Sequence, residues 1–168
     1  VGSEMCIRDR ITPATDDIEY PSLLGLPSPR LRAYPRETVI AEKLQAMVVL
    51  GMANSRMKDF YDVWMMSCEL YFDGRTLARA IQATFQHRRS QLPRTAPTAF
   101  TEEFAENPHK GTQWNAFLSR NRLDDGGSGL ARIIGQIRLF LMPLLLAASN
   151  GQEFEGTWPA GGPWAATR

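Results

Sequence analysis

Two amphipathic helices and a short turn between them account for residues 34–66, YPRETVIAEKLQAMVVLGMANSRMKDFYDVWMM. Pro35 suits the first turn of a helix and Gly51 suits a C-terminal cap, so the first helix is expected between them. Its buried stripe is predicted from the i, i+4, i+7, i+8 spacing of Ile40, Leu44, Met47 and Val48. This pattern fixes one face of the helix against a core.

Helices are also predicted along most of the remaining chain, from apolar residues at helical spacing and turn residues at their ends. The predicted ranges are Arg56 to about Tyr71 with Asn54 or Ser55 as N-cap, about Arg75 to Arg89, a short helix capped by Thr101, a helix after Pro108 that holds Trp114, and about Leu130 to Ala147. The sequence therefore predicts a mainly α fold.

Two charged residues fall on the apolar faces of the helix pair. At 100° per residue, Lys43 projects between Met47 and Leu50, whereas Gln45 lies on the polar side. A lysine in an apolar arc extends to solvent, pairs with an acid such as Asp59 across the turn, or binds a phosphate. These alternatives stay open at this point.

Asp59 lies on the apolar side of the second helix, where an acid costs stability unless it is paired. Arg56 is one turn back on that side. Lys58 and Asp62 are i, i+4 neighbours on the polar flank, and Asp59 and Asp62, three residues apart, can converge on one point. Local ion pairs explain Lys58 and Asp62 well, but they explain Asp59 poorly.

The bulk composition excludes several classes of protein. A chain of 168 residues with 43% hydrophobic and 22% charged residues suits one soluble domain, and the net charge of +1 does not predict a polyanionic partner. Cys6 and Cys68 form no metal-binding pattern, and only two histidines are present, so no zinc site is predicted. The longest apolar run, residues 133–148, is interrupted by Arg138, so no membrane span is expected. A cytoplasmic location is expected.

The chain divides into four predicted parts. Residues 1–10, VGSEMCIRDR, resemble the translated adapter scar at the ends of metagenomic reading frames and are predicted to be an artefact. Residues 11–33 are predicted to hold one remnant strand near Ile18–Tyr20 and an extended connector. Residues 34–149 form the helical region, and residues 150–168, rich in Gly, Pro and Trp, are predicted to be a disordered tail.

The most basic part of the chain is the third predicted helix with the segment that follows it. Contacts to an RNA backbone are one interpretation of its arginines, and a solvated helix face is the other. The predicted RNA contacts are Arg75, Arg79, Arg88 and Arg89. The segment GGSG at residues 126–129 is interpreted as a connector, because no metal-binding acids follow it.

Two signatures carry a resemblance to a known family: TVIAEK at residues 38–43 and RMKDFYD at residues 56–62. With the flanking text EYPSLLG, FDGRTLARAIQATF and TEEF, the chain resembles the AbiEii/AbiGii toxin family of nucleotidyltransferases between about Ile11 and Trp114. The resemblance implies an α+β, polymerase-β-like nucleotidyltransferase fold, of which this chain is expected to be a mainly α fragment.

The resemblance also implies a function and a site. Such enzymes transfer a nucleotide from a nucleoside triphosphate with Mg²⁺, in related toxins to the 3′ end of tRNA, and an antitoxin is encoded alongside. By similarity, Lys43, Lys58, Asp59 and Asp62 are the catalytic residues, and Lys43, Arg56 and Lys58 bind the nucleotide.

One departure from the family pattern is large. The family's glycine–serine turn and D-x-D metal acids have no counterpart in this chain, so no metal ligands are predicted. We therefore expect a truncated enzyme that is inactive alone. The alternative is a non-catalytic helical module that binds RNA or protein.

Overall fold

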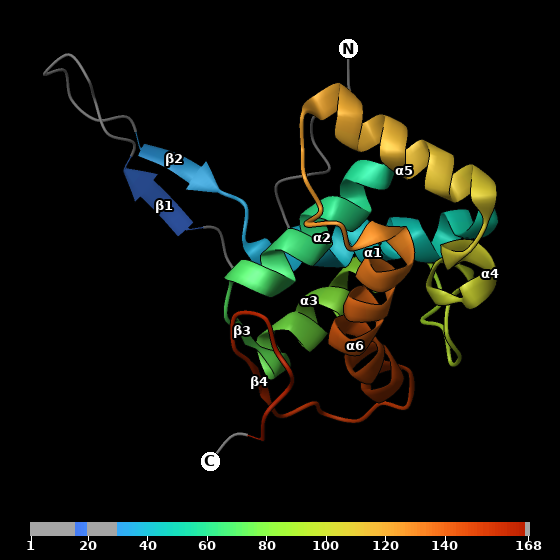
Figure 1. Ribbon diagram of the computed structural model, residues 1–168. Helices are drawn as coiled ribbons and strands as arrows, with labels where there is room; N and C mark the ends of the chain where they lie inside the picture. The colour runs from blue at the N-terminus through green and yellow to red at the C-terminus, as the bar shows by residue number, and fades with distance from the viewer. Residues whose placement is uncertain (1–15, 20–29, 167–168) are drawn as a thin grey trace, which may run out of the picture.

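The computed structural model of the protein describes residues 16–19 and 30–166 (Figure 1). Helices make up most of these residues, which confirms the predicted mainly α fold. The helices are α1 (Arg36–Leu50), α2 (Met57–Glu69), α3 (Gly74–His87), α4 (Glu102–Ala105), α5 (Pro108–Asn121) and α6 (Gly129–Ser149). The remaining elements are the 3-10 turns η1 (Gly51–Ala53) and η2 (Thr98–Phe100) and the strands β1 (Asp16–Glu19), β2 (Arg30–Ala33), β3 (Phe72–Asp73) and β4 (Thr157–Trp158). The predicted artefact at residues 1–10 lies outside the described residues.

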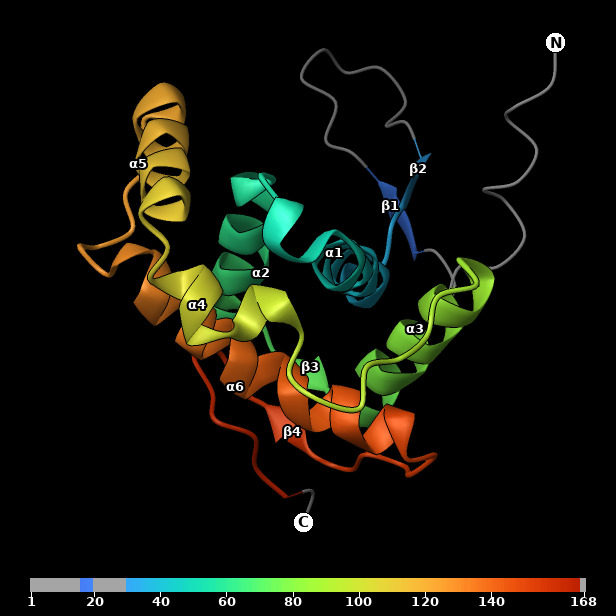
Figure 2. The ribbon, with the colours of Figure 1, turned by 90° about the vertical axis from the view of Figure 1, so that its right-hand side faces the viewer.

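Helix α1 runs through the helical body and is seen end-on near the centre of Figure 2. It packs against α2 and α3, and the predicted stripe residues Ile40, Leu44 and Met47 are fully buried. The prediction for Gln45 is wrong, because this side chain is buried. It donates to Ser90 Oγ at 3.2 Å and accepts from Arg88 Nη1 at 3.0 Å, and both partners lie in the segment directly after α3. Hydrogen bonds to this segment thus offset the burial of a polar amide.

Helix α6 packs across α2 and α3 and supplies much of the core. Ile137, Phe140 and Leu144 are fully buried on its inner face, while Leu139 is exposed. By length and composition alone the helix could cross a membrane, but half of that apolar segment is buried inside the fold. Core helices of soluble domains have the same property.

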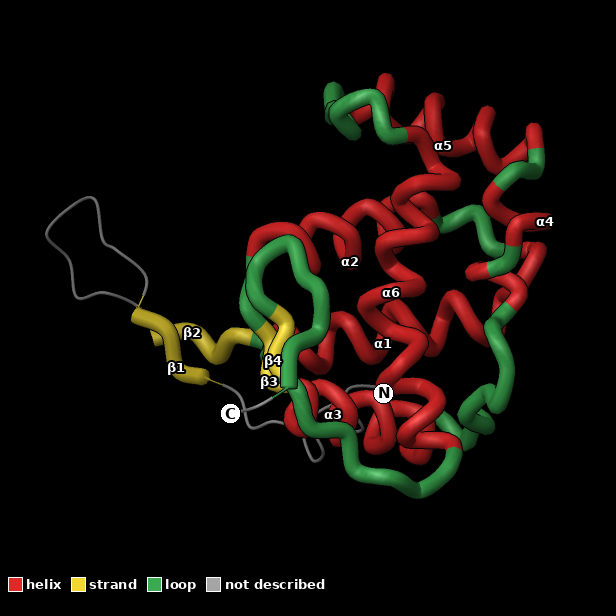
Figure 3. The backbone as a smooth tube through the Cα atoms, turned by 60° about the horizontal axis from the view of Figure 1, so that its bottom comes forward, coloured by secondary structure: helices red, strands yellow, loops and turns green. Residues whose placement is uncertain are grey.

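The first two strands correct the prediction for residues 11–33. Strand β1 pairs with β2 in an antiparallel hairpin, with Asp16 opposite Ala33 and Ile18 opposite Leu31 (Figures 1 and 3). The predicted remnant strand therefore has a partner in this chain, and residues 30–33 are a strand rather than a connector. Antiparallel pairing satisfies backbone groups that an isolated strand would leave open. The predicted strand residue Tyr20 and residues 26–29 of the connector lie outside the described residues.

The prediction that residues 150–168 form a disordered tail is wrong for the part that the structure describes. Strand β4 pairs with β3, with Phe72 opposite Trp158. Trp158 is 2% exposed, packs on Phe140 with ring centroids 4.8 Å apart, and donates its indole N–H to the carbonyl of Ser67 at 2.7 Å. Burial of this large aromatic ring anchors the tail. The division into residues 11–33 and 34–149 stays a prediction.

Candidate active site at the α1–α2 helix pair

Lys43 of α1 holds two carboxylates of α2 together. Its Nζ lies 2.7 Å from Asp59 Oδ1 and 2.8 Å from Asp62 Oδ2. The predicted pairing across the turn and the predicted convergence of the two acids are both confirmed. Lys43 and Asp59 meet because helical periodicity places them on the sides of α1 and α2 that face each other.

Two further cations surround these carboxylates. Arg56 Nε lies 2.9 Å from Asp59 Oδ2, and Lys58 Nζ lies 2.5 Å from Asp62 Oδ2. We call these five residues the Lys43 cluster. Each carboxylate contacts two cations, and three cations against two acids leave the cluster with a net charge of +1.

The cations of the cluster differ in exposure. The Lys43 side chain is 17% exposed, whereas Arg56 and Lys58 are 59% and 71% exposed. Burial lowers the pKa of Lys43, but hydrogen bonds and charges from Asp59 and Asp62 outweigh it, so the net pKa is raised. Burial raises the pKa of Asp62, but Lys43 and Lys58 hold it below its ordinary value. Both shifts favour the charged forms of Lys43 and Asp62 at neutral pH.

A buried lysine that sequence reasoning missed supports the turn before α2. Lys110 of α5 is 6% exposed and donates from Nζ to the backbone carbonyl of Asn54 at 2.7 Å. Burial lowers the pKa of Lys110. Asn54 Oδ1 in turn accepts the backbone N–H of Arg56 at 2.9 Å, so the asparagine organises the turn although Arg56 is the N-cap. Lys110 thus fixes the backbone that leads into the Lys43 cluster.

The sequence contains a signal for Lys110. Counted from this lysine, Trp114, Phe117 and Leu118 follow at i+4, i+7 and i+8. Lys110 therefore lies on the apolar stripe of α5, as Lys43 lies on the stripe of α1.

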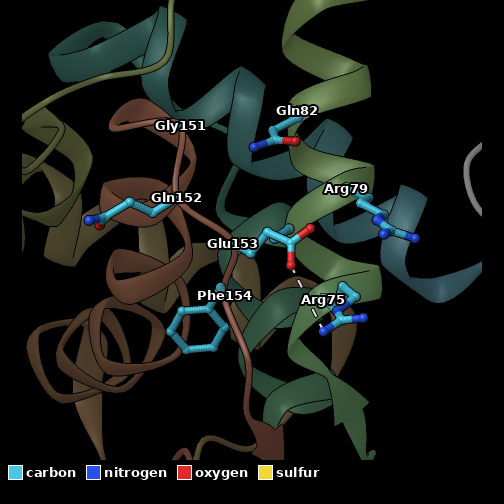
Figure 4. A pocket seen from close by; sticks show the side chains of 8 residues that line it. Arg75, Arg79, Gln82, Gly151, Gln152, Glu153 and Phe154 are labelled. Atoms are coloured by element: carbon cyan, nitrogen blue, oxygen red, sulfur yellow. Dashed lines mark ion pairs between the residues drawn. The ribbon is translucent and has the colours of Figure 1, made fainter.

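The four predicted RNA-contact arginines do not form one patch. Arg75 pairs with Glu155 and, at 3.9 Å, with Glu153 of the C-terminal segment. Figure 4 shows Arg79 beside Arg75 at a cavity of about 170 Å³ between α3 and this segment.

Arg88 and Arg89 follow the far end of α3. Arg88 lies 13 positions after Arg75, which is about 20 Å along a helix. Arg88 is engaged there with α1, because it donates to Gln45 and lies 3.7 Å from Glu42. Contact of any of these arginines with RNA stays a prediction.

The GGSG segment is ordered by a carboxylate. Asp125 is 9% exposed and accepts hydrogen bonds from the Trp114 indole at 2.9 Å and from the backbone N–H groups of Gly127 and Gly129, each at 3.1 Å. These hydrogen bonds, the Trp114 bond foremost, outweigh burial and lower the pKa of Asp125. The Asp125 carboxylate thus accepts the backbone N–H groups of Gly127 and of Gly129, the first residue of α6. Because these N–H groups are already hydrogen-bonded, the segment acts as a structural turn.

Metal ligands do not gather in the described part of the chain. No group of three or more His, Cys, Asp and Glu residues there could hold a metal ion. His87 and His109 are both exposed. The predicted roles of Lys43, Arg56, Lys58, Asp59 and Asp62 in nucleotide binding or catalysis stay predictions, although the structure brings these five residues together.

Comparison with known proteins gives one match. A family model described as "Nucleotidyl transferase AbiEii toxin, Type IV TA system" matches residues 4–127. No curated protein and no solved structure matches the chain. The matched range contains the whole Lys43 cluster as well as α5, and it ends before α6.

Proposed function

The chain belongs to the AbiEii nucleotidyltransferase toxin family of type IV toxin–antitoxin systems, and on this premise we propose that the Lys43 cluster binds the triphosphate of a nucleoside triphosphate. The observation that carries the proposal is a lysine fixed at 2.7 and 2.8 Å between two carboxylates, yet 17% exposed. The ammonium group of Lys43 has three N–H donors, and the two carboxylates account for only two of them. An open edge is needed for a phosphate oxygen to reach the ammonium group.

Different residues of the cluster have different proposed roles. Lys43 donates to a phosphate oxygen from a fixed position, and Asp59 and Asp62 hold it there. Arg56 and Lys58 are largely exposed, so their charged groups can turn from the carboxylates toward the remaining phosphate oxygens. Pre-positioning of Lys43 reduces the conformational entropy that binding costs. In this scheme Lys43, Arg56 and Lys58 touch the substrate, and the two acids are positioning residues.

The Mg²⁺ expected from the resemblance does not fit the carboxylates of the cluster. Asp59 and Asp62 each contact two cations, so a divalent cation would have to displace Lys43 and meet the charges of Arg56 and Lys58. Within the described residues, no cluster of three or more His, Cys, Asp or Glu side chains could hold a metal ion instead. We therefore assign neither acid a metal-binding role.

The family membership also supports a partner and a reaction class. An antitoxin is the expected protein partner, and the proposed reaction is nucleotidyl transfer in the cytoplasm. The 3′ end of tRNA is proposed as the acceptor from the resemblance of residues 38–43 and 56–62. Magnesium-dependent transfer by the 168-residue chain alone would refute our expectation that it is inactive alone.

Triphosphate binding tests the proposal directly. Isothermal titration calorimetry with each common ribonucleoside triphosphate should show binding that Lys43→Ala weakens about 10- to 100-fold, since a hydrogen bond to a charged group contributes ~1.5–3 kcal/mol. Arg138→Ala is the matched control, because Arg138 is exposed on α6, outside the cluster. Equal affinities of the Lys43→Ala and wild-type proteins would contradict the proposal.

A transfer assay tests the reaction itself. tRNA and labelled triphosphates would be supplied to the chain together with the D-x-D part of a related enzyme, and wild type compared with Lys43→Ala and Asp59→Ala. Normal label transfer by both variants would refute the site assignment.

The alternative function is a non-catalytic binding module. It is favoured by the ion pairs of Asp59 and Asp62, because each carboxylate already contacts two cations, as in a purely structural ion-pair network. It predicts RNA or protein binding with no triphosphate binding by the wild-type chain.

A further inference from the structure

A groove opens between the start of α2 and the last turns of α5, which lie beside each other in Figure 2. Its volume is about 350 Å³. Its lining includes three cations, two amides and one aromatic ring, together with Ser55, Met57 and Ala116: the cations are Arg56, Lys58 and Arg120, the amides are Gln113 and Asn121, and the ring is Phe117. We call it the α2–α5 groove.

The groove and the Lys43 cluster share a wall. Arg56 and Lys58 line the groove, and the same two side chains contact Asp59 and Asp62. A molecule in the groove therefore lies against residues that also bind the carboxylates around Lys43. This adjacency is what a second substrate of a transfer reaction requires, because reacting groups must be brought together.

The electrostatics of the groove favour an anion. No carboxylate lines it. Arg120 on the α5 side is exposed and has no ion-pair partner among the residues that the structure describes, so its charge is not neutralised. Arginine binds phosphate groups with several N–H donors in one plane.

The uncharged lining residues favour a nucleotide over a simple anion. Gln113 and Asn121 carry amide groups, which match the hydrogen-bonding edges of a base. Each makes one contact within α5, since Asn121 Nδ2 donates to the Phe117 carbonyl at 2.8 Å and Gln113 Oε1 accepts from Lys110 Nζ at 3.5 Å. The remaining donors and acceptors of both amides have no hydrogen-bond partner among the described residues.

Phe117 is partly exposed, with its ring fixed against Trp114 and Tyr61 at centroid distances of 5.8 Å each. A fixed aromatic ring is a stacking platform for an unpaired base.

We propose that the α2–α5 groove binds one nucleotide of a single-stranded RNA segment, which is the acceptor strand of the proposed transfer reaction. The inference rests on the proposed function for the identity of that strand. A volume of about 350 Å³ is at the small end of ligand sites and admits a single nucleotide unit, not a duplex. Arg120 contacts the phosphate, Phe117 stacks on the base, and the reactive end of the strand points toward Lys43.

Binding of a short fluorescein-labelled single-stranded RNA to the full chain, followed by fluorescence anisotropy over a range of salt concentrations, tests the proposal. Arg120→Gln should weaken binding several-fold and reduce the slope of log affinity against log salt by about 0.7, the value for one phosphate contact on a single strand. Arg138→Gln, which removes an exposed arginine from α6, should leave affinity and slope unchanged.

A second variant separates stacking from charge. Phe117→Leu should weaken RNA binding at least about fivefold without changing the salt slope, because stacking is not a phosphate contact. Circular dichroism melting checks that the variant is folded, and Arg120→Gln stands as the test if it is not. Undetectable RNA binding by the wild-type chain, or equal losses for the Arg120 and Arg138 variants, would overturn the proposal.

Measuring triphosphate binding by the same variants distinguishes this proposal from the proposed function. Arg120→Gln should leave binding of a ribonucleoside triphosphate unchanged, whereas Lys43→Ala should weaken it. If Arg120→Gln weakened triphosphate and RNA binding equally, the groove would belong to the triphosphate and the acceptor assignment would be wrong. If only the Lys43→Ala result failed, the proposed function would be refuted and RNA binding by the groove would stand.

Discussion

Lys43 and Lys58 share one carboxylate, Asp62, and differ sharply in burial. Their Nζ atoms lie 2.8 and 2.5 Å from Asp62 Oδ2, but their side chains are 17% and 71% exposed. Replacing each lysine in turn by methionine, which keeps much of the side-chain volume, removes its charge. If ion-pair distance set the contribution to stability, Lys58→Met would be the more damaging change.

Burial predicts the opposite order. Lys43→Met removes a hydrogen bond between charged groups from Asp59, whose side chain is 6% exposed, and such a bond contributes ~1.5–3 kcal/mol. The loss stays below the ~3–5 kcal/mol of a broken buried pair, because Asp59 keeps Arg56 as a partner. Lys58→Met breaks an exposed pair and should cost ~1 kcal/mol or less.

Urea denaturation at neutral pH measures both losses. We expect Lys43→Met to lower the free energy of unfolding by ~1.5–3 kcal/mol, and each kcal/mol should lower the melting temperature by about 2–4 °C in a chain of this size. A loss for Lys58→Met as large as that for Lys43→Met would refute the reasoning from burial. So would a Lys43→Met protein more stable than wild type, which would mean that the lysine is kept at a cost to stability.

Two further predictions concern the turn before α6 and the C-terminal segment. The folded-state pKa of Asp125 lies below its ordinary value of 3.8, so its stabilisation is present at neutral pH and is lost as pH falls through the folded-state pKa. Denaturation should therefore show Asp125→Asn less stable by ~1.5–3 kcal/mol at pH 7, with the difference shrinking below about pH 4, and a constant difference would contradict this account. Trp158→Ala should cost ~3–5 kcal/mol and expose the C-terminal segment to limited proteolysis, whereas a disordered tail would make the substitution neutral.

Local patterns were sufficient to predict the helices. Ile40, Leu44 and Met47 fix the inner face of α1 by spacing alone, and all three are fully buried. The pairing of β3 with β4 could not be predicted in the same way, because the two strands lie far apart in the sequence. Phe72 and Trp158 pair across 85 intervening residues, and no periodicity within the tail indicates which strand it will join.

Some residues of the site could likewise be predicted from local sequence, and others could not. Lys43 and Asp59 could be predicted, because each breaks the apolar pattern of its own helix and the two helices are adjacent in sequence. The burial of Gln45 could not be predicted, since its partners come from the segment after α3. The α2–α5 groove could not be predicted either, because its walls meet only through tertiary packing of α2 on α5.

If the Lys43 cluster binds a triphosphate as proposed, fixed and movable cations contribute to that binding in different ways. Lys43 is held by two carboxylates and loses little conformational freedom when a phosphate arrives, whereas an exposed lysine or arginine loses up to about 2 kcal/mol of side-chain entropy. Arg56 and Lys58 bear that cost, but they are the only members of the cluster that also line the groove. A substrate that draws them from Asp59 and Asp62 changes the charge that the groove presents. Binding of triphosphate and of RNA should therefore be coupled through these two side chains, and Lys43 should stay in place throughout.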